Sequence, residues 1–523
     1  MKNIVLSFIT LATFLIAGCT DEFLNTVSPN DLVEEVFWGS ESDVKLAITG
    51  CYAVLQSTDL FKTTNTGTAG LPGLDFASDN GYMTWSYMAG GELPLGNYQV
   101  SGKIVDGVWK ACYKGVARCN YLLSNISEVS ETELAPEKRA RYIAEAKFLR
   151  AMYYKYLEIL YRDVPLITET QKLSEANVPK NSRSEIVETI TNDLKTCAED
   201  LPAPGELAPS EWGRATKGAA YALLADIYLN DHQYSEAAIY AKKVLDMNYY
   251  ELFPDYATLF SKENEQCKEI IFSACFKRGL GGYGSTFGWY KQGTSRVPDN
   301  HHPLKNLADE FYCTDGLSIT ESPLYNTNLE ITNRDVRFNT TLISKGSQWH
   351  TSTVPEAQLA LTGYATRKWT EELGPNITLD QTDCDQDFYI FRLAHVILDR
   401  AEALVQAGSY SETEVIGLID MIRTRANMPK VENVEGAGLS KNKLMEIIMH
   451  ERRVETAFEA RRYLDLRRWG KLKERTDWYN NNEYVNNPKL GLRIFIEPKM
   501  NIWPIPQVEL DVNKALVQHE EWQ

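Results

Sequence analysis

The stretch from Lys443 to Trp469, KLMEIIMHERRVETAFEARRYLDLRRW, constrains the fold of this chain more than any other. Apolar residues recur along it at helical intervals, namely Leu444, Ile447, Ile448, Val454, Phe458 and Leu466. Glu451, Glu455 and Glu459 are four residues apart, so they would lie on one face of a helix. Arginines three or four positions away come within pairing distance of these carboxylates. The pattern predicts a long helix whose charges pair with each other and with neighbouring helices.

An arginine-rich helix can also form a basic patch for phosphate or nucleic acid. Within this helix, however, acidic residues offset most of the bases, and the whole chain carries a formal net charge of −17. Nucleic-acid affinity depends largely on net positive charge, so DNA, RNA and anionic membrane surfaces are poor partners for this chain. We therefore interpret the arginines as structural and expect no nucleic-acid ligand.

The N-terminal residues predict export and lipid attachment. A largely apolar run from Ile4 to Ile16 follows a single basic residue and is too short to span a bilayer, as is typical of a secretory signal. It ends in Ile-Ala-Gly-Cys, a lipobox that would be cleaved before Cys19 and acylated there. Several acyl chains anchor a protein stably where one does not. Residues 1–18 are thus predicted as a lipoprotein signal peptide and residues 19–30 as a lipid-anchored tether; an incidental cysteine after an ordinary signal is the weaker alternative.

Helical periodicity dominates the mature chain. Helices are predicted over Asp31–Val54, Val108–Ile126, Pro136–Leu160 and Ser182–Asp200. Thr216–Leu245 has the spacing of a tetratricopeptide helix pair, and a looser second pair is predicted from Tyr389 to Thr424. These hairpins predict a mostly α fold with an α-solenoid scaffold.

Two stretches interrupt the helical pattern. Thr58–Ser101 is rich in Gly, Thr, Asn and aromatic residues, which predicts a loop. Glu269–Leu379 holds short strand-like runs between Gly, Pro, Asn and Thr clusters, namely Ile270–Phe276, Ile343 and Leu359–Leu361. Both are expected to form a loop-rich region with a few short strands, packed on the helical scaffold. Near the C-terminus, Trp503–Pro506 is excluded from helices and central strands because its two prolines lack N–H donors.

Several segments together resemble one known family. They are DEFLNTVSP after Cys19, EAKFLRAMYYKYL with YRDVPLI, ERRVE with FEARRYLDLRRW, and PIPQVELDVN with a late Trp522. In order and spacing they resemble the SusD/RagB family of outer-membrane nutrient-binding lipoproteins over essentially the whole mature chain. In the family's terms, residues 31–265 would be the N-terminal helical region and residues 266–523 the C-terminal region, packed as one globular unit.

The resemblance also implies a location and a partner. The acidic residues just after Cys19 resemble the surface-export signal of such lipoproteins, which implies anchoring on the extracellular face of the outer membrane. The implied partner is a SusC-like TonB-dependent barrel transporter. In such pairs the lipoprotein acts as a hinged lid that captures oligosaccharide, while its repeats dock on the barrel.

Catalytic and metal-binding motifs are missing from the sequence. It contains no GxSxG, HExxH or GxxxxGK[ST] pattern, and no GxGxxG in a strand–helix context. The cysteines other than Cys19 lack metal-ligand spacing, so they are expected to be buried free thiols, and the adjacent His301 and His302 are interpreted as packing or exposed residues. Carboxylates are numerous enough for a glycosidase pair, but nothing marks a pair out. We predict a binding protein without enzymatic activity, cofactor or metal.

The mixture of aromatic and polar residues in the loops favours a sugar ligand. Sugar rings stack on flat aromatic faces while Asp, Asn, Gln or Arg side chains pair with their hydroxyls. The predicted contacts are Asp79, Asn80, Tyr82, Trp85 and Tyr87 in one loop, Tyr283, Trp289, Tyr290 and Arg296 in another, and Trp349 as a third contributor. Alternatively, these rings only pin the loops to the scaffold. A peptide ligand, as in a RagB-like branch of the family, remains open, as do a surface enzyme and an adhesin.

Overall fold

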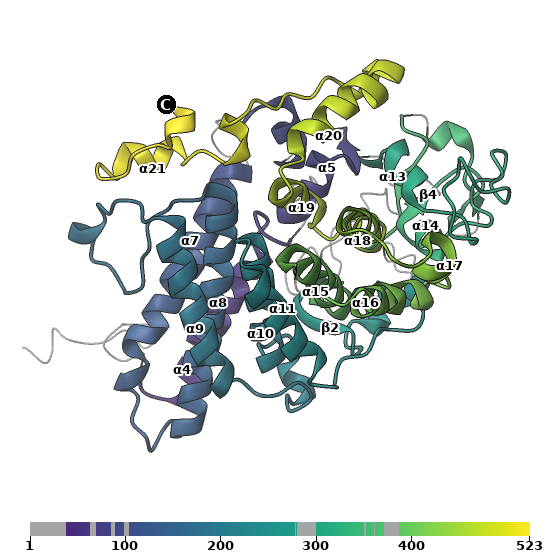
Figure 1. Ribbon diagram of the computed structural model, residues 1–523. Helices are drawn as coiled ribbons and strands as arrows, with labels where there is room; N and C mark the ends of the chain where they lie inside the picture. Colours follow the sequence, from purple (N-terminus) through teal and green to yellow (C-terminus); the bar gives the residue numbers. More distant parts are fainter. Residues whose placement is uncertain are drawn as a thin grey trace, which may run out of the picture.

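The computed structural model describes residues 38–62, 70–84, 89–98, 104–277, 279, 300–349, 352–359, 361–370, 386–408 and 410–523. The predicted signal peptide, Cys19 and the tether lie outside these residues. Helices make up most of the described chain; among the short strands, β2 lies beside the central helices and β4 among the loops at the right of Figure 1. The mostly α-helical prediction is confirmed. Within the described residues, no helix is both long and apolar enough to cross a bilayer.

The scaffold is a row of helices, each packed on the next (Figure 1). In order they are α4 (Glu41–Tyr52), α7 (Ile104–Asn125), α8 (Pro136–Tyr161), α9 (Arg183–Asp200), α10 (Lys217–Asn230), α11 (Tyr234–Leu245), α15 (Leu393–Ala407), α16 (Glu412–Arg425) and α18 (Lys441–Glu455). Both predicted tetratricopeptide-like pairs are present, as α10–α11 and α15–α16, and α11 packs directly on α15. The row therefore continues across a long intervening stretch of sequence.

Local signals set the helix ends. Pro136 occupies the first turn of α8, which stops at Tyr161 just before Val164-Pro165, as predicted. Ser182 caps α9, since its side chain accepts a hydrogen bond from the Glu185 N–H. Gly408, with φ of 75°, closes α15 in the left-handed conformation that glycine adopts without strain.

The predicted long helix over Lys443–Trp469 is broken, so this prediction is wrong in part. α18 ends at Glu455, and Phe458 and Ala460 have φ of 63° and 60° before α19 (Arg462–Arg468) begins. Residues from distant parts of the chain hydrogen-bond with the backbone between the two helices. The Trp369 indole N–H donates to Phe458 O at 2.8 Å, and the Ala460 N–H donates to an Asp75 carboxylate oxygen at 2.6 Å. Burial of Phe458 offsets the strain of its left-handed backbone, which is about 1–3 kcal/mol.

The glycine-rich stretch predicted as a loop is largely part of the core. It contains α5 (Leu74–Ala77), β1 (Gly81–Met83) and α6 (Ala89–Glu92), and Leu74 and Phe76 are fully buried. The glycines allow neighbouring groups to approach the backbone closely. A Cβ on Gly70 would lie 2.4 Å from the Asp59 carbonyl group, and a Cβ on Gly81 would lie 2.4 Å from the Phe76 ring. Composition suggested an exposed loop here because the glycines that permit dense packing are also frequent in loops.

Four two-stranded antiparallel sheets accompany the helices in the described chain. They pair β1 with β3 (His301–Pro303), β2 (Ile270–Ala274) with β8 (Phe388–Arg392), β4 (Leu342–Ile343) with β7 (Ala365–Thr366), and β5 (Gln348–Trp349) with β6 (Ser352–Thr353). The strand-like runs around Ile270 and Ile343 are confirmed. The run at Leu359 is wrong, because this residue ends the 3₁₀ helix η8 (Glu356–Leu359). Tyr389 likewise lies in β8, so the second helix pair begins only at Leu393.

Shorter helices complete the described fold. They are α12 (Tyr256–Leu259), α13 (Lys305–Glu310), α14 (Val336–Thr341), α17 (Val431–Glu435), α20 (Leu472–Tyr479) and α21 (Gln507–Val512). The Trp503–Pro506 segment is neither helix nor strand, as predicted, and the Trp503 N–H donates to Leu160 O at 2.8 Å. This bond ties the C-terminal segment to the end of α8.

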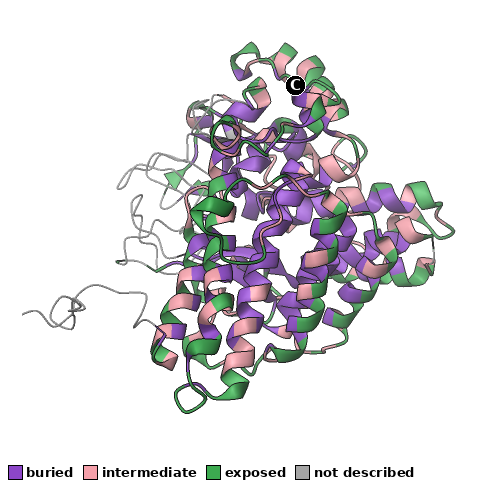
Figure 2. Ribbon diagram, turned by 90° about the vertical axis from the view of Figure 1, so that its left-hand side faces the viewer, coloured by how far each residue is buried: buried purple, intermediate pink, exposed green. Residues whose placement is uncertain are grey.

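One hydrophobic cluster extends from Trp38 to Trp522 and includes residues of both predicted regions. Figure 2 shows this buried interior running between exposed outer helical faces. The described cysteines are all free thiols, as expected; most are buried, and Cys267 and Cys275 are half-buried. His301 and His302 lie in β3 rather than in a loop and are buried, so they are packing residues.

Candidate ligand-binding face and its charge network

The β1–β3 ribbon brings the two predicted binding segments to one place. Tyr82 pairs with His302, and beyond the ribbon the Thr84 N–H donates to Asn300 O at 3.0 Å. The Thr84 hydroxyl lies 2.8 Å from His302 Nε2. Residues 85–88 follow Thr84 directly and residues 280–299 precede Asn300, so one end of each segment is held at the same point. Trp85, Tyr87, Tyr283, Trp289, Tyr290 and Arg296 themselves lie outside the described residues.

Among the predicted ligand contacts that the structure describes, Tyr82 has an accessible aromatic ring, because this residue is only half-buried. It packs against the small cluster of Leu304, Tyr479 and Leu490, and Tyr484 borders the same cluster. Burial raises the pKa of the Tyr82 phenol, so the phenol stays neutral. A pocket of about 60 Å³ beside it is far smaller than typical ligand pockets. Tyr82 therefore contributes an aromatic edge to a surface rather than to a closed pocket.

Asp79 is buried and surrounded by arginines. Its carboxylate accepts hydrogen bonds from Arg462 at 2.8 and 2.9 Å and from Arg475 at 2.5 Å, and Arg453 approaches to 3.4 Å. Burial alone would raise the pKa of Asp79, but Arg453 and Arg462 hold it well below its usual value. The side chain thus anchors the start of β1 to α18, α19 and α20. A sugar hydroxyl would have to displace an arginine to reach it.

Asn80 and Trp349 are also enclosed. Asn80 accepts from Arg453 Nε at 3.0 Å through its carbonyl oxygen, while its amide donates to Asp75 at 3.1 Å. Trp349 has no exposed surface and packs in a separate cluster with Ile343, Val354, Leu359 and Ala365. In this arrangement both residues support the surrounding loops.

Arg493, which sequence analysis did not single out, supports the ribbon from the other side. Its guanidinium lies 3.9 Å from the centre of the Tyr479 ring and donates to Ser78 O at 2.5 Å and Gly81 O at 2.6 Å. Ser78 lies in the turn that leads into β1, and Gly81 is the first residue of that strand. An isolated arginine in an irregular segment carries no periodic signal, so only the structure identifies this role.

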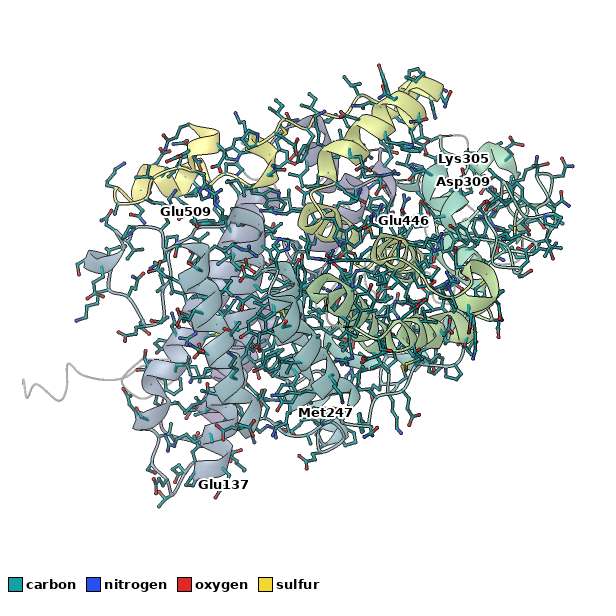
Figure 3. The ribbon with its side chains drawn as sticks, in the orientation of Figure 1. Glu137, Met247, Lys305, Asp309, Glu446 and Glu509 are labelled. Atoms are coloured by element: carbon teal, nitrogen blue, oxygen red, sulfur yellow. The ribbon has the colours of Figure 1, made fainter. Side chains whose placement is uncertain are left out.

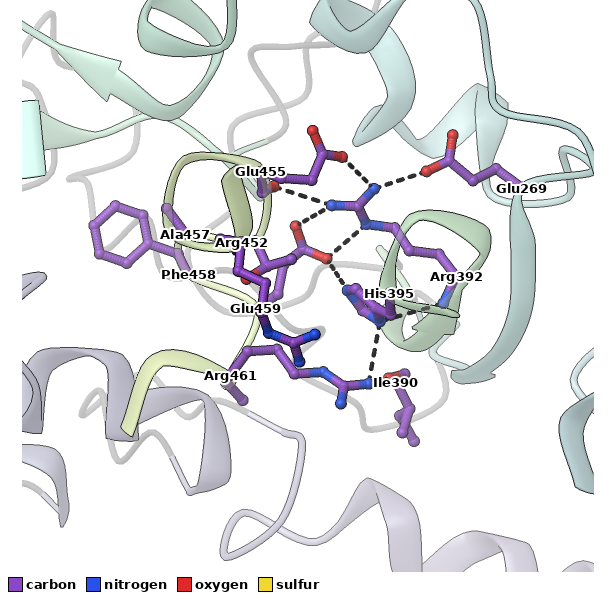
Figure 4. Close-up of polar contacts among 12 residues, drawn as sticks. Glu269, Ile390, Arg392, His395, Arg452, Glu455, Ala457, Phe458, Glu459 and Arg461 are labelled. Atoms are coloured by element: carbon purple, nitrogen blue, oxygen red, sulfur yellow. Dashed lines mark hydrogen bonds and ion pairs between the residues drawn. The ribbon is translucent and has the colours of Figure 1, made fainter. Parts of the chain in front are cut away.

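A second part of the charge network lies in the break between α18 and α19 (Figure 4). Arg392 donates to Glu455 and Glu269, each at 2.7 Å, and pairs through two further bonds with Glu459. Lys368 donates to Glu459 at 2.5 Å. All of these side chains have 0% exposure, so their charges are compensated inside the protein. The structural interpretation of the charged residues in this stretch is confirmed.

His395 completes this network in its neutral form. Its Nε2 lies 2.7 Å from a Glu459 oxygen, while Arg461 Nη2 lies 3.1 Å from its Nδ1. Arginine can only donate, so Nδ1 accepts and Nε2 carries the proton. Burial and the nearby Arg461 lower the pKa of His395 to about 3. Within the described chain, no group of three or more His, Cys, Asp or Glu side chains is arranged to hold a metal ion.

Family models match two long parts of this chain. The SusD family model matches residues 268–522, and a model described as "Starch-binding associating with outer membrane" matches residues 22–229. A SusD-like protein of Formosa agariphila is 26% identical over 544 residues, covering 98% of each chain. The starch-binding protein SusD of Bacteroides thetaiotaomicron is 24% identical over 485 residues, covering 83% of this chain and 82% of SusD.

Solved structures share the same architecture. A SusD-like carbohydrate-binding protein from Bacteroides fragilis superimposes with a TM-score of 0.80 at 26% identity, over 92% of this chain and all of that chain. A laminarin-binding SusD-like protein superimposes with a TM-score of 0.70 at 24% identity, which shows the shared fold. The family models match both halves of the sequence, and the model that matches residues 268–522 covers the ERRVE and FEARRYLDLRRW segments. This chain belongs to the SusD/RagB family.

Proposed function

We propose that this protein is a cell-surface glycan-binding lipoprotein that acts as the extracellular lid of a SusC-like TonB-dependent barrel transporter. Relatives named for starch, laminarin or carbohydrate binding support the ligand class. The description of the matching N-terminal family model supports association with the outer membrane. The proposed activity is capture of ligand, with no chemical step.

The observation that carries the proposal is the pairing of β1 with β3. It fixes one end of each aromatic-rich segment at the same point, through Thr84 and Asn300. The ribbon is in turn held by the arginines on Asp79 and by Arg493. Binding surfaces need such rigid support, because a loop that must be ordered by its ligand loses affinity.

We propose that the glycan contacts are aromatic rings with a few polar partners. They are Tyr82, Trp85, Tyr87, Tyr283, Trp289, Tyr290 and Arg296. Asp79 and Asn80 support the ribbon beneath this surface, and Trp349 supports a neighbouring loop. Binding would depend on ring stacking and hydroxyl pairing, so it should change little with salt.

Calorimetric titration of the chain from Thr20 onward against oligosaccharides and oligopeptides tests this function. Trp85→Ala and Trp289→Ala should each abolish saccharide binding while circular dichroism stays unchanged. Trp212→Ala is the matched control, because Trp212 is a half-buried tryptophan in the turn before α10, where it lines a separate small pocket with Tyr249. Saccharide binding that survives both loop substitutions would refute the proposed site. Salt-sensitive binding of peptides alone would replace the glycan with a peptide ligand.

Membrane attachment is tested separately through Cys19. Cys19→Ser should move the protein from the outer-membrane fraction to the soluble fraction and remove labelled acyl chains. External protease should degrade the wild-type protein on intact cells if it faces outward. Mild detergent extraction should recover it with a TonB-dependent barrel, and recovery without any barrel would contradict the lid role.

A further inference from the structure

A groove of about 840 Å³ is lined by residues of α7, of the segment 165–178 and of α21. Figure 1 shows α7 and α21 on the same side of the molecule. Its lining is largely apolar and includes Trp109, Tyr113, Val116, Ile167, Val512 and Leu516. Glu509 on α21, labelled in Figure 3, also lines the groove and lies beside Trp109. The groove is separate from the β1–β3 ribbon, since none of its lining residues belongs to the ribbon or to the charge network beneath it.

Most polar groups of the groove wall already have partners within the protein. The Tyr113 hydroxyl donates to Pro165 O at 2.7 Å, and the Asn120 amide donates to Ile167 O at 2.9 Å. On the opposite wall, the Asn513 amide donates to Val178 O at 2.7 Å. These bonds hold the three walls together. They leave an apolar floor that favours an apolar peptide segment over a hydroxyl-rich sugar.

The rim of the groove is exposed and apolar, with two lysines nearby. Leu173 is 93% exposed and Val512 is 72% exposed, although both face the groove. Lys110 and Lys172 are also exposed at its edge. Exposed apolar side chains around a groove indicate a surface that is covered in the functional protein. Glu169 and Glu509 line the groove as well, and Lys110 lies 3.9 Å from Asp106, so the apolar surface and not the charge selects the occupant.

The described chain begins at one end of this groove. The Trp38 ring lies 5.5 Å from that of Tyr121, which directly follows the groove residue Asn120 in α7. Trp38 directly follows residues 20–37 in the sequence, so this segment joins the described chain beside the groove. Fully extended, these eighteen residues span about 60 Å at roughly 3.3 Å each. The α7 wall from Trp109 to Asn120 is only about 16 Å long, at 1.5 Å per residue.

The composition of residues 20–37 matches the groove. This segment has apolar residues for the floor, with Phe23, Leu24 and Val27 close together. We propose that residues 20–37 of this chain dock in the groove, with Phe23, Leu24 and Val27 on its apolar floor. The segment after the lipidated cysteine then orients the protein body relative to the membrane instead of acting as a free tether.

Hydrogen exchange on two forms of the protein tests this docking. One form starts at Thr20 and the other at Phe37, and circular dichroism verifies that both are folded. Residues 165–178 and 507–516 should exchange at least about ten times more slowly in the longer form, whereas α10 and α11 should not differ. A synthetic peptide of residues 20–36 should restore the protection to the shorter form. Equal exchange in both forms would overturn the proposal.

Two variants and a control peptide give the test specificity. Val512→Asp places a charge on the exposed rim and should weaken peptide binding at least about tenfold, the difference that 1.4 kcal/mol makes. Val485→Asp is the matched control, because Val485 is 63% exposed and lies outside the groove. A peptide with Phe23, Leu24 and Val27 replaced by serine should not bind. Equal binding by this peptide, or protection that appears only when a barrel transporter is added, would refute docking of the chain's own segment.

Discussion

Arg392 and Glu459 pair through one edge of the guanidinium group, with Nε to Oε2 and Nη2 to Oε1 each at 2.7 Å. Arg392 ends β8 and Glu459 lies in the break between α18 and α19, so the pair joins two distant parts of the chain (Figure 4). Two parallel charge-assisted bonds are strong and geometrically specific. The pair stabilises the break because Arg392 holds the Glu459 carboxylate in one position.

Glu459→Gln should destabilise the protein by about 3–5 kcal/mol, because Arg392 and Lys368 lose a buried counter-charge. Guanidinium unfolding followed by far-UV circular dichroism measures this change. Glu356→Gln is the control, since Glu356 pairs with Lys345 on an exposed surface and its loss should have no measurable effect. Similar stability losses in the two variants would contradict the structural role of the buried network.

Asp79→Asn and Tyr82→Ala should affect different properties: the first should lower stability and the second should lower saccharide affinity. Asp79→Asn removes the charge shared by three arginines and should cost about 3–5 kcal/mol of stability, with faster hydrogen exchange in β1. Tyr82→Ala should lower saccharide affinity and leave the unfolding midpoint nearly unchanged, because the ring is half-exposed. A loss of affinity in Asp79→Asn without any loss of stability would instead make Asp79 a direct ligand contact.

Gly115→Ala should destabilise the contact between α7 and α8 by about 1–3 kcal/mol. A Cβ at Gly115 would lie 2.3 to 2.6 Å from three atoms of the buried Tyr153 ring, so one helix must shift. Gly50→Ala in α4 is the matched control, since its Cβ meets nothing within 4 Å and should stabilise the helix by about 0.5–1 kcal/mol. Thermal unfolding of the two variants should therefore shift in opposite directions.

Stability should also depend on pH through Asp75. Burial raises the pKa of Asp75 from 3.8 to about 7, although N–H groups of Asn80 and Ala460 favour its charged form. Between about pH 4 and pH 7 the folded state therefore holds a proton that the unfolded state has released. The contribution of Asp75 to stability falls as pH rises through this window, by up to about 1.4 kcal/mol per pH unit. Asp75→Asn should remove this slope from unfolding free energies measured at several pH values, and an unchanged slope would assign it to other groups.

Much of the scaffold was predictable because its signals are local. The bounds of α8, the Ser182 cap of α9 and the two tetratricopeptide-like pairs follow from spacing, capping and proline positions within a few turns. The charged stretch after Lys443 was also correctly interpreted as structural. Its division into α18 and α19 was not visible, since the bonds that replace helical ones come from Trp369 and Asp75.

The candidate site shows where sequence reasoning ends. Sequence alone determined the residue types, the helical periods and the family motifs, and it identified the aromatic-rich segments that follow β1 and precede β3. Only the tertiary structure decided that Asp79 is a buried anchor, because Arg462 and Arg475, which hold it, follow 383 and 396 residues later. It likewise decided that Trp349 is buried and that β1 pairs with β3. Whether a polar or aromatic side chain meets solvent or a partner depends on packing between distant segments, and no local pattern encodes that packing.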